Sequence, residues 1–147
     1  MNVSELMTEN PECCTPDDSV AEAARIMQRL DVGFIPIIES QDTRRLVGCL
    51  TDRDIVVRAI AEGKDADLCT CGDVMSRDLV SCSPDDDIER CRDLMEDNQL
   101  RRVLICDEDG ALRGVVAMAD VARVLEEEKI GETTRAVSQP SGSAPTA

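Results

Sequence analysis

The sequence predicts an α/β (α+β) fold built from two similar halves, and three observations lead to this prediction. Short segments recur at a spacing of 66 to 68 residues along the 147-residue chain. Apolar positions with helical spacing alternate with short β-rich runs. Each half has only about 60 residues, a size that is marginal for an independent domain. We therefore expect the two halves to pack their sheets together and to share one core.

The repeat is clearest where the main helix of each half is expected to begin. The segment Cys14-Thr15-Pro16-Asp17-Asp18 matches Cys82-Ser83-Pro84-Asp85-Asp86 at an offset of 68, the same offset that separates Met7 from Met75. Thr15 and Ser83 are suitable N-caps, each followed by Pro at the first helical position and by Asp in the first turn. The pattern predicts a helix that begins at Pro16 in the first half and at Pro84 in the second.

The other elements follow in the same order in both halves, so that each half is predicted to be helix–strand–helix–strand–strand–helix. The predicted strands are 34–38, 46–50, 103–106 and 112–117, and the predicted closing helices are 52–61 and 118–127. Charged turns join the strands, and one of them has the Asp-Gly signal of a β-hairpin. We divide the chain into a first repeat (1–62), a linker (63–71), a second repeat (72–128) and a flexible tail (129–147) whose composition is rich in Ser, Pro and Gly.

The stretch Gly48-Cys49-Leu50-Thr51-Asp52-Arg53-Asp54 organises the first repeat. An apolar strand ends at Thr51, and Thr51 and Asp54 have the spacing of a capping box at the start of the next helix. The same point in the fold presents backbone N–H groups that suit a polar, anionic ligand. Capping and ligand contact require the same geometry, so both roles remain open for Thr51.

Composition limits the kinds of partner. The formal charge of −15 argues against nucleic-acid binding, which needs a basic face. An anionic ligand must therefore be held by a local group of arginines. The chain has one Phe, Phe34, and neither Tyr nor Trp, so the core and any base-binding pocket must be aliphatic. We find no signal-peptide pattern and no apolar run of membrane-spanning length, and we expect a cytoplasmic protein with no membrane partner.

Eight cysteines are present, and most are expected to be reduced, buried thiols. The chain has no His and no C-x-x-C motif, which excludes mixed Cys/His zinc sites, and no metal site is expected. The pairs Cys13-Cys14 and Cys69-Cys71 are the two places where a redox role is considered. The sequence has no glycine-rich phosphate loop and no nucleophile with a neighbouring base, so we do not expect an enzyme, a catalytic residue or a catalytic cofactor.

Over residues 1 to 128 the pattern resembles the CBS domain in its tandem form, the Bateman module. The resemblance is carried by two motifs in register, Gly48 to Asp54 and Gly114 to Asp120, and is supported by segments 32–37 and 100–105. It implies two repeats related by a pseudo-twofold axis, with one or two clefts between them that bind an adenine nucleotide. It also implies a homodimer formed through helices.

Carried over by position, the resemblance assigns residues to each cleft. In the first cleft, Thr51 and Asp54 would contact the ribose or phosphate and Arg101 and Arg102 would face the phosphates, while the base would lie near Leu100, Val103 and segment 75–80. The second cleft would use Asp120 together with Val32, Gly33, Phe34, Ile35 and Pro36, and Arg101 is a candidate phosphate ligand there too.

Two departures distinguish the second cleft from the family pattern. Ala117 stands where Thr or Ser is usual, and Leu104 replaces a usual Pro. We therefore expect the cleft of Thr51 and Asp54 to be the better nucleotide site. The predicted function is a stand-alone regulatory module that binds AMP, ADP or ATP, senses energy charge and acts in trans on an unidentified protein partner. The alternative is a stress-related structural or interaction protein with vestigial clefts.

Overall fold

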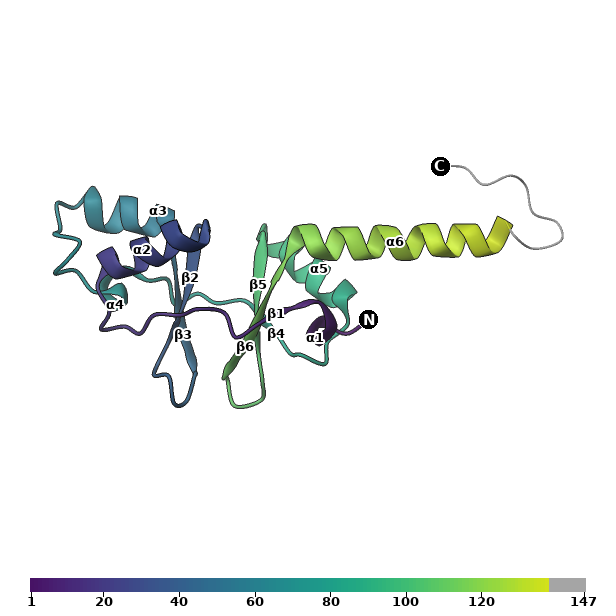
Figure 1. The fold of residues 1–147 in the computed structure, drawn as a ribbon, viewed down its shortest axis with the longest axis horizontal. Helices are drawn as coiled ribbons and strands as arrows, with labels where there is room; N and C mark the ends of the chain where they lie inside the picture. The colour runs from purple at the N-terminus through teal and green to yellow at the C-terminus, as the bar shows by residue number, and fades with distance from the viewer. Residues whose placement is uncertain (138–147) are drawn as a thin grey trace.

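The computed structural model describes residues 1–137, and it forms two lobes that lie side by side (Figure 1). Two β-hairpins face each other at the centre, and helices lie beside each hairpin. Helix α6 extends outward from the second lobe. The elements in chain order are α1 (Val3–Leu6), β1 (Thr8–Glu9), α2 (Val20–Leu30), β2 (Phe34–Ile38), β3 (Leu46–Thr51), α3 (Asp52–Asp54), the π-helix η1 (Ile55–Ile60), α4 (Cys71–Val74), β4 (Ser81–Cys82), α5 (Ile88–Asn98), β5 (Arg102–Cys106), β6 (Leu112–Ala117) and α6 (Met118–Val137).

The two lobes exchange their first segments. Strand β1 pairs antiparallel with β6 of the second repeat, in a sheet whose order is β1-β6-β5-β4. In the reciprocal arrangement, Ser76 at the start of the second repeat forms an antiparallel bridge with Cys49 of the first. The short helices cross with them: Val3 of α1 is buried in the second core, and Val74 of α4 is buried in the first. Each lobe is therefore completed by the first residues of the other repeat.

This crossing depends on two glycines at matching positions, Gly48 and Gly114. A Cβ atom at Gly114 would lie 2.7 Å from Sδ of Met7 and 2.8 Å from the carbonyl oxygen of Thr8. A Cβ atom at Gly48 would overlap Sδ of Met75 and lie 3.1 Å from a backbone oxygen of the crossing segment. The close approach of the backbones explains why both motifs begin with Gly.

The two hairpins meet about a pseudo-twofold axis. The Leu46 N–H donates to the Gly110 carbonyl at 3.0 Å, and the Leu112 N–H donates to the Arg44 carbonyl at 2.8 Å. These hydrogen bonds are symmetry mates, because each residue in the second is matched in the first at an offset of 66. A small apolar cluster around Ile38 and Leu112 is shared by the two sheets. The predicted sheet-to-sheet packing of two α/β repeats is therefore confirmed.

The main helices begin later than predicted. Helix α2 starts at Val20, where the Ser19 hydroxyl accepts a hydrogen bond from the Glu22 N–H at 3.1 Å, and α5 starts at Ile88 with Asp87 as its cap. The predicted N-caps form turns instead: the Thr15 N–H donates to the Asp18 carboxylate at 2.8 Å, and the same bond is repeated in the second half. The Thr/Ser–Pro–Asp–Asp pattern fits a side-chain-closed turn as well as it fits a cap.

The closing helices also differ from the prediction. The helix expected at 52–61 consists of one short α-helical turn followed by η1, in which the hydrogen bonds have the wider π spacing. Helix α6 continues to Val137, so residues 129–137 are helical where a flexible tail was expected, and residues 138–147 lie outside the described part. Among the described residues, no helix combines the length and the apolar character needed to cross a membrane.

Candidate functional site

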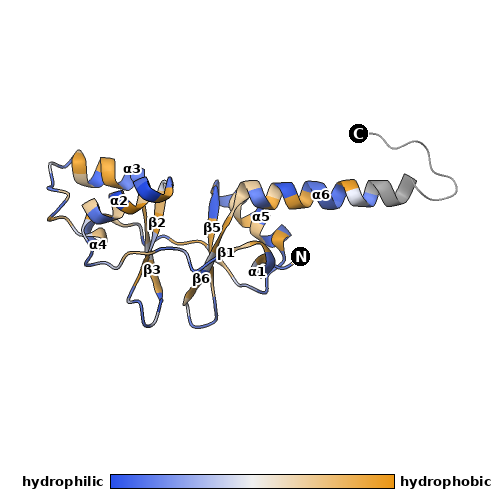
Figure 2. Cartoon of the chain, viewed as in Figure 1, coloured by the Kyte–Doolittle hydropathy of each residue, from blue (hydrophilic) through white to orange (hydrophobic). Residues whose placement is uncertain are grey.

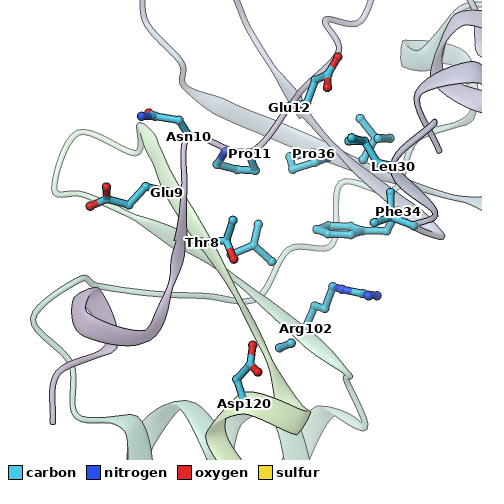
Figure 3. Close-up of a pocket in the computed structure, with 14 residues that line it drawn as sticks. Thr8, Glu9, Asn10, Pro11, Glu12, Leu30, Phe34, Pro36, Arg102 and Asp120 are labelled. Atoms are coloured by element: carbon cyan, nitrogen blue, oxygen red, sulfur yellow. The ribbon is translucent and has the colours of Figure 1, made fainter. Parts of the chain in front are cut away.

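Two clefts open between the lobes, one on each side of the paired hairpins. The larger has a volume of about 720 Å³ and is named here the Thr51 cleft. It is lined by Gly33, Phe34, Cys49, Thr51, Asp52, Arg53, Asp78, Leu79, Val80, Gln99, Leu100, Arg101, Arg102 and Leu104. The smaller, the Asp120 cleft, has a volume of about 490 Å³ (Figure 3). It is lined by Thr8, Glu9, Asn10, Pro11, Glu12, Leu30, Val32, Phe34, Ile35, Pro36, Arg102, Val115, Ala117 and Asp120.

The clefts are related by the same pseudo-symmetry as the repeats. Val32 of one cleft matches Leu100 of the other, and Pro36 matches Leu104, each at an offset of 68. At the motif position, Ala117 matches Thr51. The clefts therefore have one design, and their chemical differences come from substitutions at equivalent positions.

Thr51 stands at the end of β3 in the predicted capping box. Its hydroxyl oxygen accepts a hydrogen bond from the Asp54 N–H at 3.0 Å, and Oδ2 of Asp54 accepts one from the Thr51 N–H, also at 3.0 Å. The proton of the Thr51 hydroxyl is not used by these bonds. Thr51 therefore caps the helix and retains a donor for a ligand in the cleft.

Asp54 is more enclosed than Thr51 and does not line the cleft. Its side chain is 16% exposed, and its second oxygen, Oδ1, lies 3.9 Å from Nε of Arg58 one turn along the helix. Its neighbour Asp52 lines the cleft instead. In this conformation Asp54 acts mainly in the cap.

Three arginines give the Thr51 cleft its cationic side. Arg53, Arg101 and Arg102 all line it, against the two carboxylates of Asp52 and Asp78. In the part of the chain that the structure describes, no carboxylate lies within 4.0 Å of these three guanidinium groups, although seven other ion pairs occur. In a protein with a charge of −15, such a group of arginines suits a phosphate-bearing ligand.

The Asp120 cleft has the opposite balance. Its carboxylates are Glu9, Glu12 and Asp120, and Arg102 is the one basic side chain among its described lining residues. Asp120 points into the cavity from the start of α6 (Figure 3); its side chain is 49% exposed and lies 3.5 Å from Arg123. Glu12 forms an ion pair with Arg29. This cleft is more apolar, lacks a threonine hydroxyl at position 117 and has less to offer an anion.

Phe34 and Arg102 form the wall between the clefts, and both side chains line both cavities. The guanidinium carbon of Arg102 lies 5.7 Å from the centroid of the Phe34 ring, which is a cation–π contact. Figure 3 shows the two side chains side by side. The prediction that neighbouring arginines diverge toward different clefts holds in part, because Arg101 faces the Thr51 cleft alone while Arg102 faces both.

Most of the predicted site residues lie in the clefts assigned to them, and three do not. Val103 is 1% exposed and belongs to the second core, because it points to the opposite face of β5. Gly33 lines the Thr51 cleft rather than the Asp120 cleft, and Asp54 is held in the cap. The segment 8–12 was missed in the Asp120 cleft. Repeat symmetry could have found it, because segment 76–80 had already been assigned to the other cleft.

The cysteines are mainly structural. All eight are free, and five are buried, as predicted. Burial raises the pKa of Cys49, which lines the Thr51 cleft, to about 12, and the Asp54 charge adds to the effect. Burial likewise raises the pKa of Cys106 to about 11 and raises that of Cys13 above its ordinary value. Thiols held in the neutral form are poor nucleophiles.

Comparison with known proteins gives consistent matches. The model of the family described as "CBS domain" matches residues 3–60 and 71–127. The CBS domain-containing protein YhcV of Bacillus subtilis is 38% identical over 121 residues, which cover 82% of this chain and 83% of that protein. Hypoxic response protein 1 of Mycobacterium tuberculosis is 33% identical over 136 residues, covering 92% and 93% of the two chains.

Solved structures match as well. The crystal structure of Hypoxic Response Protein I with two coordinated zinc ions has a TM-score of 0.74 at 32% identity, covering 84% of this chain and 98% of that one. The present chain has no His, and its described residues contain no group of three or more His, Cys, Asp or Glu side chains suited to a metal. The structure of CBSX2 in complex with AMP has a TM-score of 0.72 at 23% identity, covering 87% of this chain and 98% of that one, which supports the fold alone.

Proposed function

The chain belongs to the CBS-domain family, with two repeats in tandem, and from this premise we propose that it is a regulatory module that binds an adenine nucleotide in the Thr51 cleft. The ligand would be AMP, ADP or ATP. The observation that carries the proposal is the group formed by Arg53, Arg101 and Arg102, which line this cleft without a carboxylate partner. The comparisons indicate no catalytic family.

The rest of the Thr51 cleft has the properties that a nucleotide needs. Its volume of about 720 Å³ is within the usual range for small-molecule sites, about 300–1,000 Å³. Leu79, Val80 and Leu100 provide aliphatic walls between which a planar base could lie. No aromatic stacking partner is required, because apolar burial of the two faces of the base is sufficient.

The ribose contact is the least constrained part of the proposal. Asp54 would accept hydrogen bonds from the ribose hydroxyls through Oδ1, the oxygen that the cap leaves free. The carboxylate of Asp52, which lines the cleft, is the competing acceptor. Replacing each by Asn separates the two assignments, since only the residue that accepts from the hydroxyls should lower AMP affinity when its charge is removed.

The output would be a change in assembly that a protein partner recognises. Val56, Val57 and Ile60 of η1 are 57%, 46% and 56% exposed, and Figure 2 shows apolar colouring on this helix at the outer end of the first lobe. We assign these side chains to the homodimer surface, because burying them against a second copy removes apolar area from water. Sedimentation of Val57→Asp tests this: the variant should be monomeric at concentrations at which the unaltered protein is a dimer.

Nucleotide binding is tested by calorimetric unfolding with and without millimolar AMP, ADP and ATP. A ligand that binds only the folded state raises the midpoint, by about 2.7 kcal/mol of added stability at one hundred times its Kd. Arg101→Met should reduce the shift strongly. Arg92→Met, on the exposed face of α5 and paired with Asp93, is the matched control and should leave the shift unchanged.

The absence of a shift with all three nucleotides would favour the second candidate, an interaction protein with vestigial clefts. One observation favours that alternative: Ala117 removes the hydroxyl from the second cleft. The proposed regulatory role places the protein in the cytoplasm, where nucleotide concentrations change with energy state.

A further inference from the structure

Phe34 and Arg102 occupy the same position in the two repeats, 68 residues apart, and they contact each other. Each stands opposite the motif residue of its own hairpin: Phe34 pairs with Thr51, and Arg102 pairs with Ala117. The contact therefore lies at the pseudo-twofold axis, but it is not symmetric, because one mate is an aromatic ring and the other is a cation. The symmetric position thus supplies one charge where there are two clefts.

The clefts depend on this charge to different extents. The Thr51 cleft has Arg53 and Arg101 in addition to Arg102. Among the described lining residues of the Asp120 cleft, Arg102 is the only basic side chain, and it faces three carboxylates. A phosphate in the Asp120 cleft would need Arg102, whereas a phosphate in the Thr51 cleft would use it together with two other arginines.

We propose that Arg102 is shared between the clefts, so that a phosphate-bearing ligand in one lowers the affinity of the other for a second. The inference rests on the proposed nucleotide binding and adds to it a negative coupling with a named residue. A guanidinium holds a phosphate best with two parallel N–H donors, and one side chain can present this edge to only one cleft at a time. Coupling of this kind is reciprocal, so either cleft can be filled first.

The charge of the ligand sets the strength of the effect. AMP in the Thr51 cleft turns Arg102 toward that side and leaves the Asp120 cleft with carboxylates alone. Adenosine has no phosphate and makes no demand on Arg102, so its binding to the two clefts should be independent. The difference between AMP and adenosine separates competition for the arginine from a general change in shape.

The test isolates each cleft by filling the other with a large side chain at matched positions. Val32→Trp obstructs the Asp120 cleft and Leu100→Trp obstructs the Thr51 cleft; both residues are half-buried lining residues, and both variants retain Arg102. Titration calorimetry with AMP gives one association constant for each variant, after circular dichroism has shown that each is folded. If the clefts are coupled, the product of the two constants of the unaltered protein is smaller than the product of the single-cleft constants, by about 5-fold or more.

Arg102→Met, combined with each blocking substitution, should remove the deficit. Arg101→Met, which alters a residue that lines only one cleft, should weaken binding but keep the deficit. Equal products in the unaltered protein, or a deficit that survives Arg102→Met or appears with adenosine, would overturn the inference.

If only the Val32→Trp variant binds AMP, the Asp120 cleft is not a phosphate site. The inference then fails while the proposed function stands. If no variant and no unaltered protein binds AMP at millimolar concentration, both fail.

Discussion

The exchange of first segments between the lobes makes a direct prediction for Gly48 and Gly114. Replacing Gly114 by Ala puts a methyl group 2.8 Å from the Thr8 carbonyl oxygen, an atom fixed in the β1–β6 pairing, and 2.7 Å from Sδ of Met7. Because a backbone atom cannot rotate away, β1 must shift. We expect a loss of about 2–3 kcal/mol, the upper part of the range for overpacking. For a chain of this length that lowers Tm by about 4–12 °C.

Gly48→Ala should cost less, about 1–2 kcal/mol, because its closest obstacle is the flexible end of the Met75 side chain. Truncating Met75 in the same chain should therefore recover more of the loss than truncating Met7 recovers for Gly114→Ala. A double-mutant cycle for each pair measures this difference.

Urea unfolding followed by circular dichroism is a suitable assay, because the chain has no Trp. Gly131→Ala is the matched control: nothing lies within 4 Å of its Cβ position in α6, so the substitution should raise stability by about 0.5–1 kcal/mol. If Gly114→Ala were as stable as the unaltered protein, the close approach of β1 to β6 would be wrong.

Two further predictions concern the helix caps and the buried thiols. Thr51→Ala should cost about 1 kcal/mol, because it removes the cap from α3, while Ala117→Thr should gain about the same by completing a capping box with Asp120; equal effects on urea stability at both positions would contradict this. The raised pKa values of Cys49 and Cys106, about 12 and about 11, mean that the unfolded chain loses thiol protons from about pH 9 while the folded chain keeps them. Stability under reducing conditions should therefore fall as the pH rises from 9 toward 12, and Cys49→Ser should make the fall shallower; an unchanged pH profile in that variant would refute the assignment.

The local features of the fold could be predicted because short-range chemistry determines them. The capping box of Thr51 and Asp54 and the strands that flank the two hairpins follow from spacing and side-chain type, and the structure reproduces them. The repeat offset of 66 to 68 residues led directly to the paired sheets. These features required no knowledge of which distant segments meet.

The features that escaped prediction depend on distant contacts. Nothing in segment 8–12 indicates that it crosses to the other repeat and lines the Asp120 cleft, because its partners lie in β6, more than one hundred residues away. The position of Val103 was missed for a simpler reason: successive residues of a strand alternate between faces, and the face of β5 that Val103 occupies is the buried one. The shared position of Arg102 depends on both contributions.

The central claim is that an adenine nucleotide binds in the Thr51 cleft, and methyl NMR during an AMP titration tests it most directly. Labelled Leu79, Val80 and Leu100 report on this cleft, and Leu30, Val32 and Val115 report on the Asp120 cleft. We predict that the first group shifts at lower AMP concentrations than the second, and that Arg101→Met weakens the response. Shifts confined to the Asp120 group, or none at millimolar AMP, would contradict the account.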